Sequence, residues 1–158
     1  PSPTVISYNT AASACEKGGL WLWALDLLAE MCHGSLEPNI VTYDAVISAC
    51  GKAAMWELAL RSFFDMQEKH LHPNVITYNA LISACGNGEQ CQRALSLLGQ
   101  VSRDLEPDTI TYNAAISACE RSGQWESGLL ALHEMQSRQI LPDLITYNSA
   151  ISACEKAS

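Results

Sequence analysis

The chain has 158 residues, of which 48% are hydrophobic and 16% are charged. That much apolar surface excludes a wholly disordered chain, and a net charge of −8 argues against a histone-like or polybasic membrane-surface protein. No apolar run reaches the roughly 18 residues of a membrane span, so no membrane partner is expected. The sequence starts at Pro1 without a visible targeting segment, and we expect it to be part of a longer protein.

One segment recurs five times along the chain and predicts a helix each time. Its copies read YNTAASACEK (8–17), YDAVISACGK (43–52), YNALISACGN (78–87), YNAAISACER (112–121) and YNSAISACEK (147–156). Tyr43, Ile47 and Cys50 show its apolar spacing, which is helical.

A second predicted helix follows each of the first four copies. Its apolar stripe is clearest in Trp21, Ala24, Leu25, Leu28 and Met31, in Trp56, Ala59, Leu60, Phe63 and Met66, and in Trp125, Gly128, Leu129, Leu132 and Met135.

Recurrence at about 35 residues indicates a stacked array of helix pairs rather than one globular core. We predict an all-α fold, a right-handed α-solenoid superhelix of antiparallel helix pairs. The predicted repeats are 5–39, 40–74, 75–108 (one residue short) and 109–143, with a partial repeat, its first helix only, at 144–158. A proline followed by Asn or Asp closes each full repeat, and that Asn or Asp is a good N-cap for the next helix.

Five of the seven cysteines follow the same period, namely Cys15, Cys50, Cys85, Cys119 and Cys154. No C-x-x-C pair occurs, and no histidine stands at ligand spacing from a cysteine pair, so no metal or cofactor is expected. A cysteine that recurs once per repeat is more simply a small apolar packing residue. The sequence also lacks a catalytic Ser/His/Asp spacing and a phosphate-binding glycine loop, so we do not predict an enzyme.

Polar residues recur where neighbouring first helices should meet. The tyrosine is followed by asparagine in four copies and by Asp44 in the second, although packing between helices does not require an amide there. Each of these residues should face the same gap as the Asn or Asp that follows the closing proline, and an amide suits the edge of a nucleobase. Helix capping is the alternative for the residues after proline, and the spacing alone leaves both open. The candidates are Asn9, Asn39, Asp44, Asn74, Asn79, Asp108, Asn113, Asp143 and Asn148.

The repeat closely resembles the pentatricopeptide repeat (PPR) family, with repeats of the P type. The matching starts are VISYN (5–9), IVTYD (40–44), VITYN (75–79), TITYN (109–113) and LITYN (144–148), whereas the W-x2-L-G-x2-Y pattern of tetratricopeptide repeats is absent. The resemblance implies binding of single-stranded RNA, one nucleotide per repeat, along first helices that line the inner face. It also implies location in a chloroplast or mitochondrion and a role in RNA processing, stability or expression.

The resemblance further implies which base each repeat reads. Asn with Asp resembles the uridine pair of the family, and Asn with Asn its pyrimidine pair. The implied target is therefore 5′-Y-N-U-U-3′, with the N-terminus at the 5′ end. The second repeat departs from the pattern because Asp44 pairs with Asn74. An ionised carboxylate only accepts hydrogen bonds, so this repeat should prefer a base with an amino group.

Two more sets of residues fit an RNA track. The resemblance implies that bases are sandwiched between Ile6, Val41, Ile76, Ile110 and Ile145, with ordinary core packing as the alternative. The candidate phosphate partners are Lys17, Lys52, Arg121 and Lys156, which would also stabilise helix C-termini. The competing function is a protein-interaction scaffold, but a peptide groove would vary between repeats, so the regular asparagines favour RNA. Further repeats or a fused domain could lie outside this chain.

Overall fold

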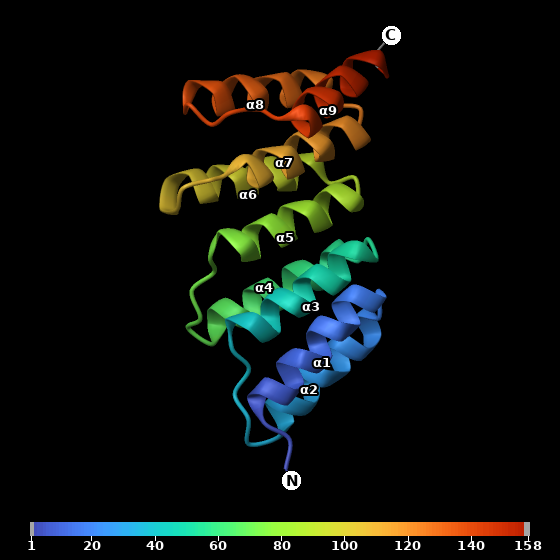
Figure 1. The fold of residues 1–158 in the computed structure, drawn as a ribbon, viewed down its shortest axis with the longest axis vertical. Helices are drawn as coiled ribbons and strands as arrows, with labels where there is room; N and C mark the ends of the chain where they lie inside the picture. Colours follow the sequence, from blue (N-terminus) through green and yellow to red (C-terminus); the bar gives the residue numbers. More distant parts are fainter. Residues whose placement is uncertain (1, 157–158) are drawn as a thin grey trace.

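The computed structural model describes residues 2–156, and within that range it contains nine α-helices and no strand (Figure 1). The helices are α1 (Val5–Gly18), α2 (Trp21–His33), α3 (Ile40–Lys52), α4 (Trp56–Glu68), α5 (Val75–Asn87), α6 (Cys91–Asp104), α7 (Thr109–Arg121), α8 (Trp125–Ser137) and α9 (Leu144–Glu155). They stack in chain order from the N-terminus to the C-terminus of an elongated molecule.

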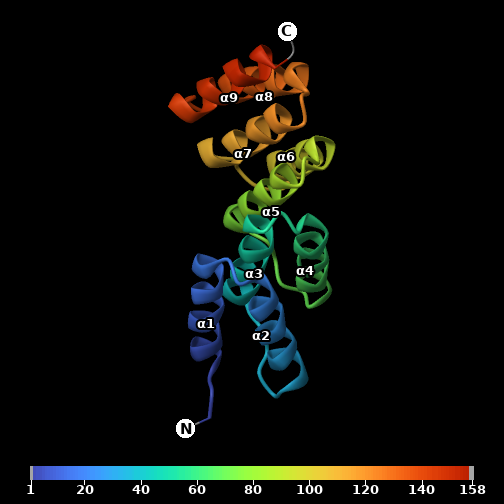
Figure 2. The same ribbon diagram turned by 90° about the vertical axis from the view of Figure 1, so that its right-hand side faces the viewer.

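The helices form two layers, as Figure 2 shows. The odd-numbered helices α1, α3, α5, α7 and α9 contact one another in succession. Within the described residues the even-numbered helices contact only the odd-numbered helices of their own and the next pair. This arrangement confirms the predicted all-α solenoid. The odd-numbered helices form a continuous stack, and neighbouring helices of that stack belong to successive helix pairs.

Each odd-numbered helix begins at a side-chain cap, as the positions after the prolines predict. The caps of the last four are Asn39, Asn74, Asp108 and Asp143. In each case the side-chain oxygen accepts a hydrogen bond from the backbone N–H three residues later, and the side chain of that later residue accepts from the cap's own N–H. The helix α1 has the same reciprocal box between Thr4 and Ser7. The capping role proposed for these residues is therefore confirmed, and it places one cap at every junction between neighbouring odd-numbered helices.

The recurring cysteine closes the first helix of each full pair through its backbone, and in the three central copies its side chain lies in the core. Cys15 is partly buried and Cys154 is exposed. The carbonyl oxygen of Cys50 accepts from the N–H of Met55 at 2.9 Å, just after Ala54 takes a left-handed φ of 58°. Cys50, Cys85 and Cys119 are buried. Burial raises the pKa of Cys50 and of Cys85 to about 11, so both remain protonated thiols. These cysteines are apolar packing residues, as predicted.

Two of the recurring tyrosines join the first helix to the second helix of the same pair by a hydrogen bond. Tyr112 is fully buried, and its hydroxyl donates to Oε1 of Glu134 on α8 at 3.0 Å. Tyr43 bonds in the same way to Asp65 on α4. Burial and the adjacent Glu134 carboxylate raise the pKa of Tyr112 to about 12. Tyr147 on α9 has no second helix over it in the described part of the chain and is 45% exposed.

The tryptophans of the second helices are less buried than their place in the apolar stripe predicts. Trp56 is half-buried and lies against the turn of the next pair, where a Cβ on Gly88 would stand 2.1 Å from its ring. Arg93 covers the same ring, with its guanidinium carbon 4.8 Å from the ring centre. The deep core is formed instead by the methionines, Met31, Met66 and Met135.

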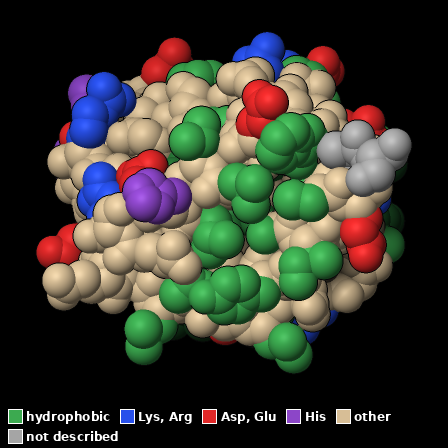
Figure 3. Space-filling view, turned by 90° about the horizontal axis from the view of Figure 1, so that it is seen from above, with side chains coloured by type: hydrophobic (Ala, Val, Ile, Leu, Met, Phe, Trp, Pro, Cys, Tyr) green, Lys and Arg blue, Asp and Glu red, His purple; other side chains and the backbone are tan. Residues whose placement is uncertain are grey.

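Apolar side chains gather at the C-terminal end of the stack, which Figure 3 views from above. A groove of 430 Å³ there is lined by Leu129, Leu132, Tyr147, Ala150, Ile151, Cys154 and Glu155. No helix in residues 2–156 combines the length and the apolar character that crossing a membrane requires.

Candidate nucleic-acid interface

Polar pairs occupy the four gaps between successive odd-numbered helices, and we number the gaps from the N-terminus. Gap 1 holds Asn9 and Asn39, gap 2 Asp44 and Asn74, gap 3 Asn79 and Asp108, and gap 4 Asn113 and Asp143. In three gaps the two members are hydrogen-bonded to each other through Nδ2 of the first and Oδ1 of the second. The distances are 3.1 Å in gap 1, 3.3 Å in gap 3 and 3.1 Å in gap 4. The structure thus brings together residues that are about 30 positions apart in the sequence.

Capping leaves one polar side-chain atom open in two of the second members, Asn39 and Asp108. Asn39, Asp108 and Asp143 are exposed although Oδ1 of each is occupied by its own helix and by the first member of its gap. Nδ2 of Asn39 and Oδ2 of Asp108 have no hydrogen-bond partner in residues 2–156. In these two side chains the atom that caps the helix differs from the atom that stays open.

The second members of gaps 3 and 4 are ionised acceptors. Burial raises the pKa of Asp108, but hydrogen bonds from Thr111 and Asn79 outweigh it and lower the pKa below the usual value. The pKa of Asp143 is lowered chiefly by the backbone N–H of Thr146. Both carboxylates are therefore charged at neutral pH and offer acceptors only.

Gap 2 is built differently. Oδ1 of Asp44 accepts from the hydroxyl of Thr77 at 2.6 Å, and within the described residues Asp44 makes no direct bond to Asn74. Burial raises the pKa of Asp44, although the Thr77 hydroxyl acts in the opposite direction. Gap 2 thus holds a half-buried carboxylate where the other gaps hold an amide.

Aliphatic side chains flank the gaps and are exposed. Between 53% and 77% of the surface is accessible in the set Ile6, Val41, Ile76, Ile110 and Ile145. Exposure on this scale excludes core packing as their role. Asn148, the remaining candidate, is exposed on α9.

Two neighbouring grooves on the odd-numbered helices are lined by several of the predicted residues. A groove of 370 Å³ has Asn79 at gap 3 between Ile76 and Ile110. The next, of 300 Å³, has Asn113 and Asp143 at gap 4 between Ile110 and Ile145. Lys52 lines the first groove and Arg121 the second. Each groove therefore offers two aliphatic walls, an amide at gap 3 or 4, and a cation, and Ile110 is a wall of both.

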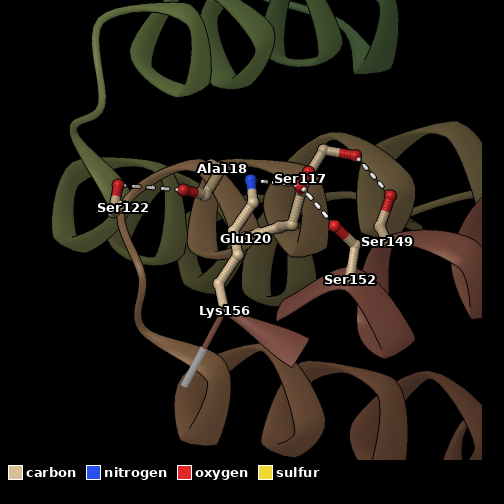
Figure 4. A network of polar contacts seen from close by, with 7 residues as sticks. All are labelled: Ser117, Ala118, Glu120, Ser122, Ser149, Ser152 and Lys156. Carbon is tan, nitrogen blue, oxygen red and sulfur yellow. Dashed lines mark hydrogen bonds and ion pairs between the residues drawn. The ribbon is translucent and has the colours of Figure 1, made fainter. Parts of the chain in front are cut away.

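The predicted phosphate partners are mostly engaged by the preceding first helix. Nζ of Lys52 lies 3.0 Å from Oε1 of Glu16, and Nζ of Lys156 lies 2.7 Å from Oε1 of Glu120 (Figure 4). Hydroxyls of the same helices, Ser48 and Ser152, also donate to these glutamates. Arg121 donates to Oδ1 of Asn87. Lys17 is exposed and has no ion pair within the described residues.

The sequence analysis did not single out these glutamates. They occupy one recurring position, directly before the cation, that reads Glu16, Gly51, Gly86, Glu120 and Glu155. Where it is glycine the helices lie closer, because a Cβ on Gly51 or Gly86 would stand 3.0 or 3.1 Å from the Cβ of an alanine on the next first helix. The exchange of Glu for Gly at this position in the second and third copies was visible in the aligned repeats and could have indicated which junctions carry an ion pair.

Models of one repeat family match almost the whole chain. A pentatricopeptide repeat domain model matches residues 26–88, a PPR repeat family model matches 107–156, and a PPR repeat model matches 6–34 and 76–104. The chain belongs to the pentatricopeptide repeat family. No sequence among the curated proteins matches it significantly.

Solved pentatricopeptide repeat structures share the fold. The crystal structure of PPR10 from maize is 32% identical over 97% of this chain and 22% of that one, with a TM-score of 0.79. PPR10 in complex with an 18-nucleotide psaJ RNA element is 26% identical over 98% of this chain and 23% of that one, with a TM-score of 0.87. The chain thus spans less than a quarter of the length of PPR10.

A third structure supports the fold alone. The PPR domain of Arabidopsis thaliana protein-only RNase P 1, in complex with tRNA, is 16% identical over 94% of this chain and 82% of that one, with a TM-score of 0.79.

Proposed function

We propose that this pentatricopeptide repeat chain binds single-stranded RNA along the odd-numbered helices, with one base in each gap. The observation that carries the proposal is the pair of grooves that share Ile110, since each combines aliphatic walls, a first-member amide and a cation. Flat bases fit between aliphatic walls, and the polar pair is placed to meet a base edge. In this proposal residues 5–39, 40–74, 75–108 and 109–143 are full repeats and 144–158 is a partial one.

The free atoms of each pair suggest the base it selects. Gap 1 offers amide N–H groups from both members, which suits the N3 and O2 acceptors of cytosine and tolerates uracil through its carbonyl. Gaps 3 and 4 offer one amide N–H and one carboxylate acceptor, which suits a uracil carbonyl together with its N3–H. Gap 2 offers a carboxylate acceptor and the amide of Asn74, which suits an amino group beside a ring nitrogen. The proposed target remains 5′-Y-N-U-U-3′, with cytosine or adenine favoured at the second position.

The test is direct titration with short RNAs. Aliphatic stacking and one or two hydrogen bonds contribute roughly 1–2 kcal/mol per base, so four bases give a dissociation constant between about millimolar and micromolar. NMR titration covers this range. We expect 5′-CCUU-3′ to bind at least about tenfold more tightly than 5′-CCGG-3′ and to shift resonances of Ile76, Ile110 and Ile145. Equal affinities, or shifts confined to the even-numbered helices, would contradict the proposal.

We further propose that the protein acts by binding rather than catalysis and serves RNA processing, stability or expression in a chloroplast or mitochondrion. The family membership supports this assignment, and PPR10 is a member whose structure holds an RNA element.

Replacing Asp44 with asparagine should convert gap 2 to the arrangement of gap 1. A half-buried charge near the RNA track is removed, so we expect affinity for 5′-CCUU-3′ to rise several-fold and the preference for an amino-bearing base to relax towards any pyrimidine. Titration against RNAs that vary only at the second nucleotide measures this. An unchanged preference there would show that Asp44 does not contact the base.

The same variant has a predictable effect on stability. Because burial raises the pKa of Asp44, its charged form destabilises the fold at neutral pH. The variant should therefore melt at a higher temperature than the wild type at pH 7. The difference should shrink as the pH falls through the raised pKa and vanish below about pH 4, where the unfolded chain is protonated as well. A melting-temperature difference that does not depend on pH would contradict this explanation.

Replacing Glu16 with glutamine should strengthen binding to every sequence. The carboxylate competes with phosphate for Lys52, whereas glutamine keeps an acceptor for Ser48 without the charge. Releasing one lysine should steepen the dependence of log affinity on log salt concentration by about 0.7. Glu68→Gln is the matched control, since it removes the same charge from an exposed position at the end of α4. If both variants change the slope equally, the effect is general charge and not the release of Lys52.

A further inference from the structure

Each of the four gaps has a buried threonine next to its second member. Thr42, Thr77, Thr111 and Thr146 each occupy the third position of a first helix, directly before its tyrosine, and none has any accessible surface. In α1 this position is Ser7. Capping accounts for the bonds between each threonine and its own cap residue. The hydroxyls of Thr42, Thr77 and Thr146 make a further contact that capping does not require.

The hydrogen bonds at gap 1 have a defined direction. The hydroxyl oxygen of Thr42 accepts from the N–H of Asn39 at 3.2 Å. It lies 2.6 Å from Oδ1 of Asn9 and 3.2 Å from Oδ1 of Asn39, so the nearer oxygen, that of Asn9, takes its one proton. Nδ2 of Asn9 then donates to Oδ1 of Asn39 at 3.1 Å. Oδ1 of Asn39 is held by the backbone N–H of Thr42, so a flipped Asn9 amide would place its oxygen against that oxygen and would also remove the acceptor of the Thr42 proton. The threonine and the cap together therefore favour one orientation, and the second N–H of the amide stays free.

Gap 4 repeats this arrangement and gap 2 a version of it. The hydroxyl of Thr146 accepts from the N–H of Asp143 at 3.0 Å. It lies 2.5 Å from Oδ1 of Asn113 and 2.9 Å from Oδ1 of Asp143, so it donates to the nearer oxygen, that of Asn113. The hydroxyl of Thr77 holds Oδ1 of Asp44, which leaves Oδ2 as the acceptor of gap 2. In each case the proton crosses from one repeat to the previous one.

Gap 3 lacks this crossing. The hydroxyl of Thr111 donates to Oδ1 of Asp108 in its own repeat at 2.8 Å. Oδ1 of Asn79 is buried without a partner in the described residues, and one bond of 3.3 Å, from Nδ2 to Asp108, holds its amide. The chain therefore contains two uridine-type gaps that differ in whether a threonine orients the amide.

We infer that Thr42, Thr77 and Thr146 are positioning residues that set base specificity by orienting the first member of each gap across the repeat boundary. The inference rests on the proposed function. It predicts that gap 4 discriminates uridine from cytidine more strictly than gap 3, because two groups, Thr146 and Asp143, fix the Asn113 amide. A single bond fixes Asn79.

The experiment compares Thr146→Val with Thr111→Val and Thr146→Ser. Both valine variants lose the same capping hydroxyl, but only Thr146→Val loses a crossing bond, and serine keeps the hydroxyl. Titrations with 5′-CCUU-3′, 5′-CCUC-3′ and 5′-CCCU-3′ report the preference at the fourth and third nucleotides separately. We expect Thr146→Val to lower the uridine preference at the fourth nucleotide about tenfold. Thr111→Val should change the preference at the third nucleotide by less than about twofold, and Thr146→Ser should resemble the wild type.

A readout without RNA separates this inference from the proposed function. The side-chain amide protons of Asn113 should exchange with water faster in Thr146→Val than in the wild type, whereas those of Asn79 should be unaffected by Thr111→Val. If the wild type binds no RNA, the proposed function fails and the exchange rates still decide whether the threonine orients the amide. Should Thr146→Val unfold α9, Thr42→Val tests the same bond at gap 1 through the first nucleotide and the Asn9 amide. The inference would be overturned if Thr146→Val and Thr111→Val lost base preference equally. It would also be overturned if a folded Thr146→Val or Thr42→Val variant lost none.

Discussion

Replacing Asp143 with asparagine is expected to change the preference at the fourth nucleotide from uridine to cytidine. Asp143 offers only acceptors, and hydrogen bonds keep its pKa low, so it remains an acceptor at neutral pH. The N3–H of uracil matches that acceptor, whereas N3 of cytosine is itself an acceptor. The amide of an asparagine reverses the match while its oxygen can still cap α9, as the asparagines at Asn39 and Asn74 do for their helices.

The expected change is large because both bases are affected. Uridine loses its matched hydrogen bond to Asp143, and the N–H of the new asparagine faces the N3–H of uracil. Each effect contributes about 1–2 kcal/mol, so the ratio of uridine to cytidine affinity should change by about 100-fold. Competition titration of 5′-CCUU-3′ against 5′-CCUC-3′ measures the ratio. Asp104→Asn, on the exposed end of α6, removes the same charge away from the gaps and should leave the ratio unchanged. A ratio that stays in favour of uridine in Asp143→Asn would show that this side chain does not read the base.

Replacing Ile110 with alanine should weaken binding about 30-fold without lowering stability. Ile110 is a wall of both grooves, so its truncation removes one face of two base sites. Each lost contact should contribute about 1 kcal/mol, at the lower end of the range for stacking on side chains. The side chain is 63% exposed, so little buried apolar surface is lost from the folded protein.

Leu130→Ala is the matched control for this experiment. Leu130 lies on α8, in the other layer of the solenoid, and is 70% exposed. Its truncation should change neither the affinity for 5′-CCUU-3′ nor the melting temperature. Similar affinity losses in the two variants would indicate that exposed apolar surface in general, and not the groove, binds the RNA. A fall in melting temperature for Ile110→Ala alone would indicate a structural role.

The local architecture follows from short-range patterns in the sequence. The apolar spacing of Tyr43, Ile47 and Cys50 marks a helix, and an Asn or Asp after proline marks where each helix begins. These features act within a few residues through backbone hydrogen bonds and the periodicity of the helix, so repetition at one period was enough to predict a stacked array. The candidate residues of the gaps were found for the same reason, because they recur in register with that pattern.

Which atoms remain available for a ligand depended on contacts between repeats. Lys52 and Lys156 were identified as cations, but only the approach of the preceding helix revealed that Glu16 and Glu120 hold them. Thr111 and Thr146 occupy the same position in their repeats, yet the nearest acceptor of the hydroxyl is Asp108, the cap of the same helix, for Thr111 and Asn113 of the preceding repeat for Thr146. These contacts are made between neighbouring helices, so they arise from the packing of the stack and not from the order of residues along one helix.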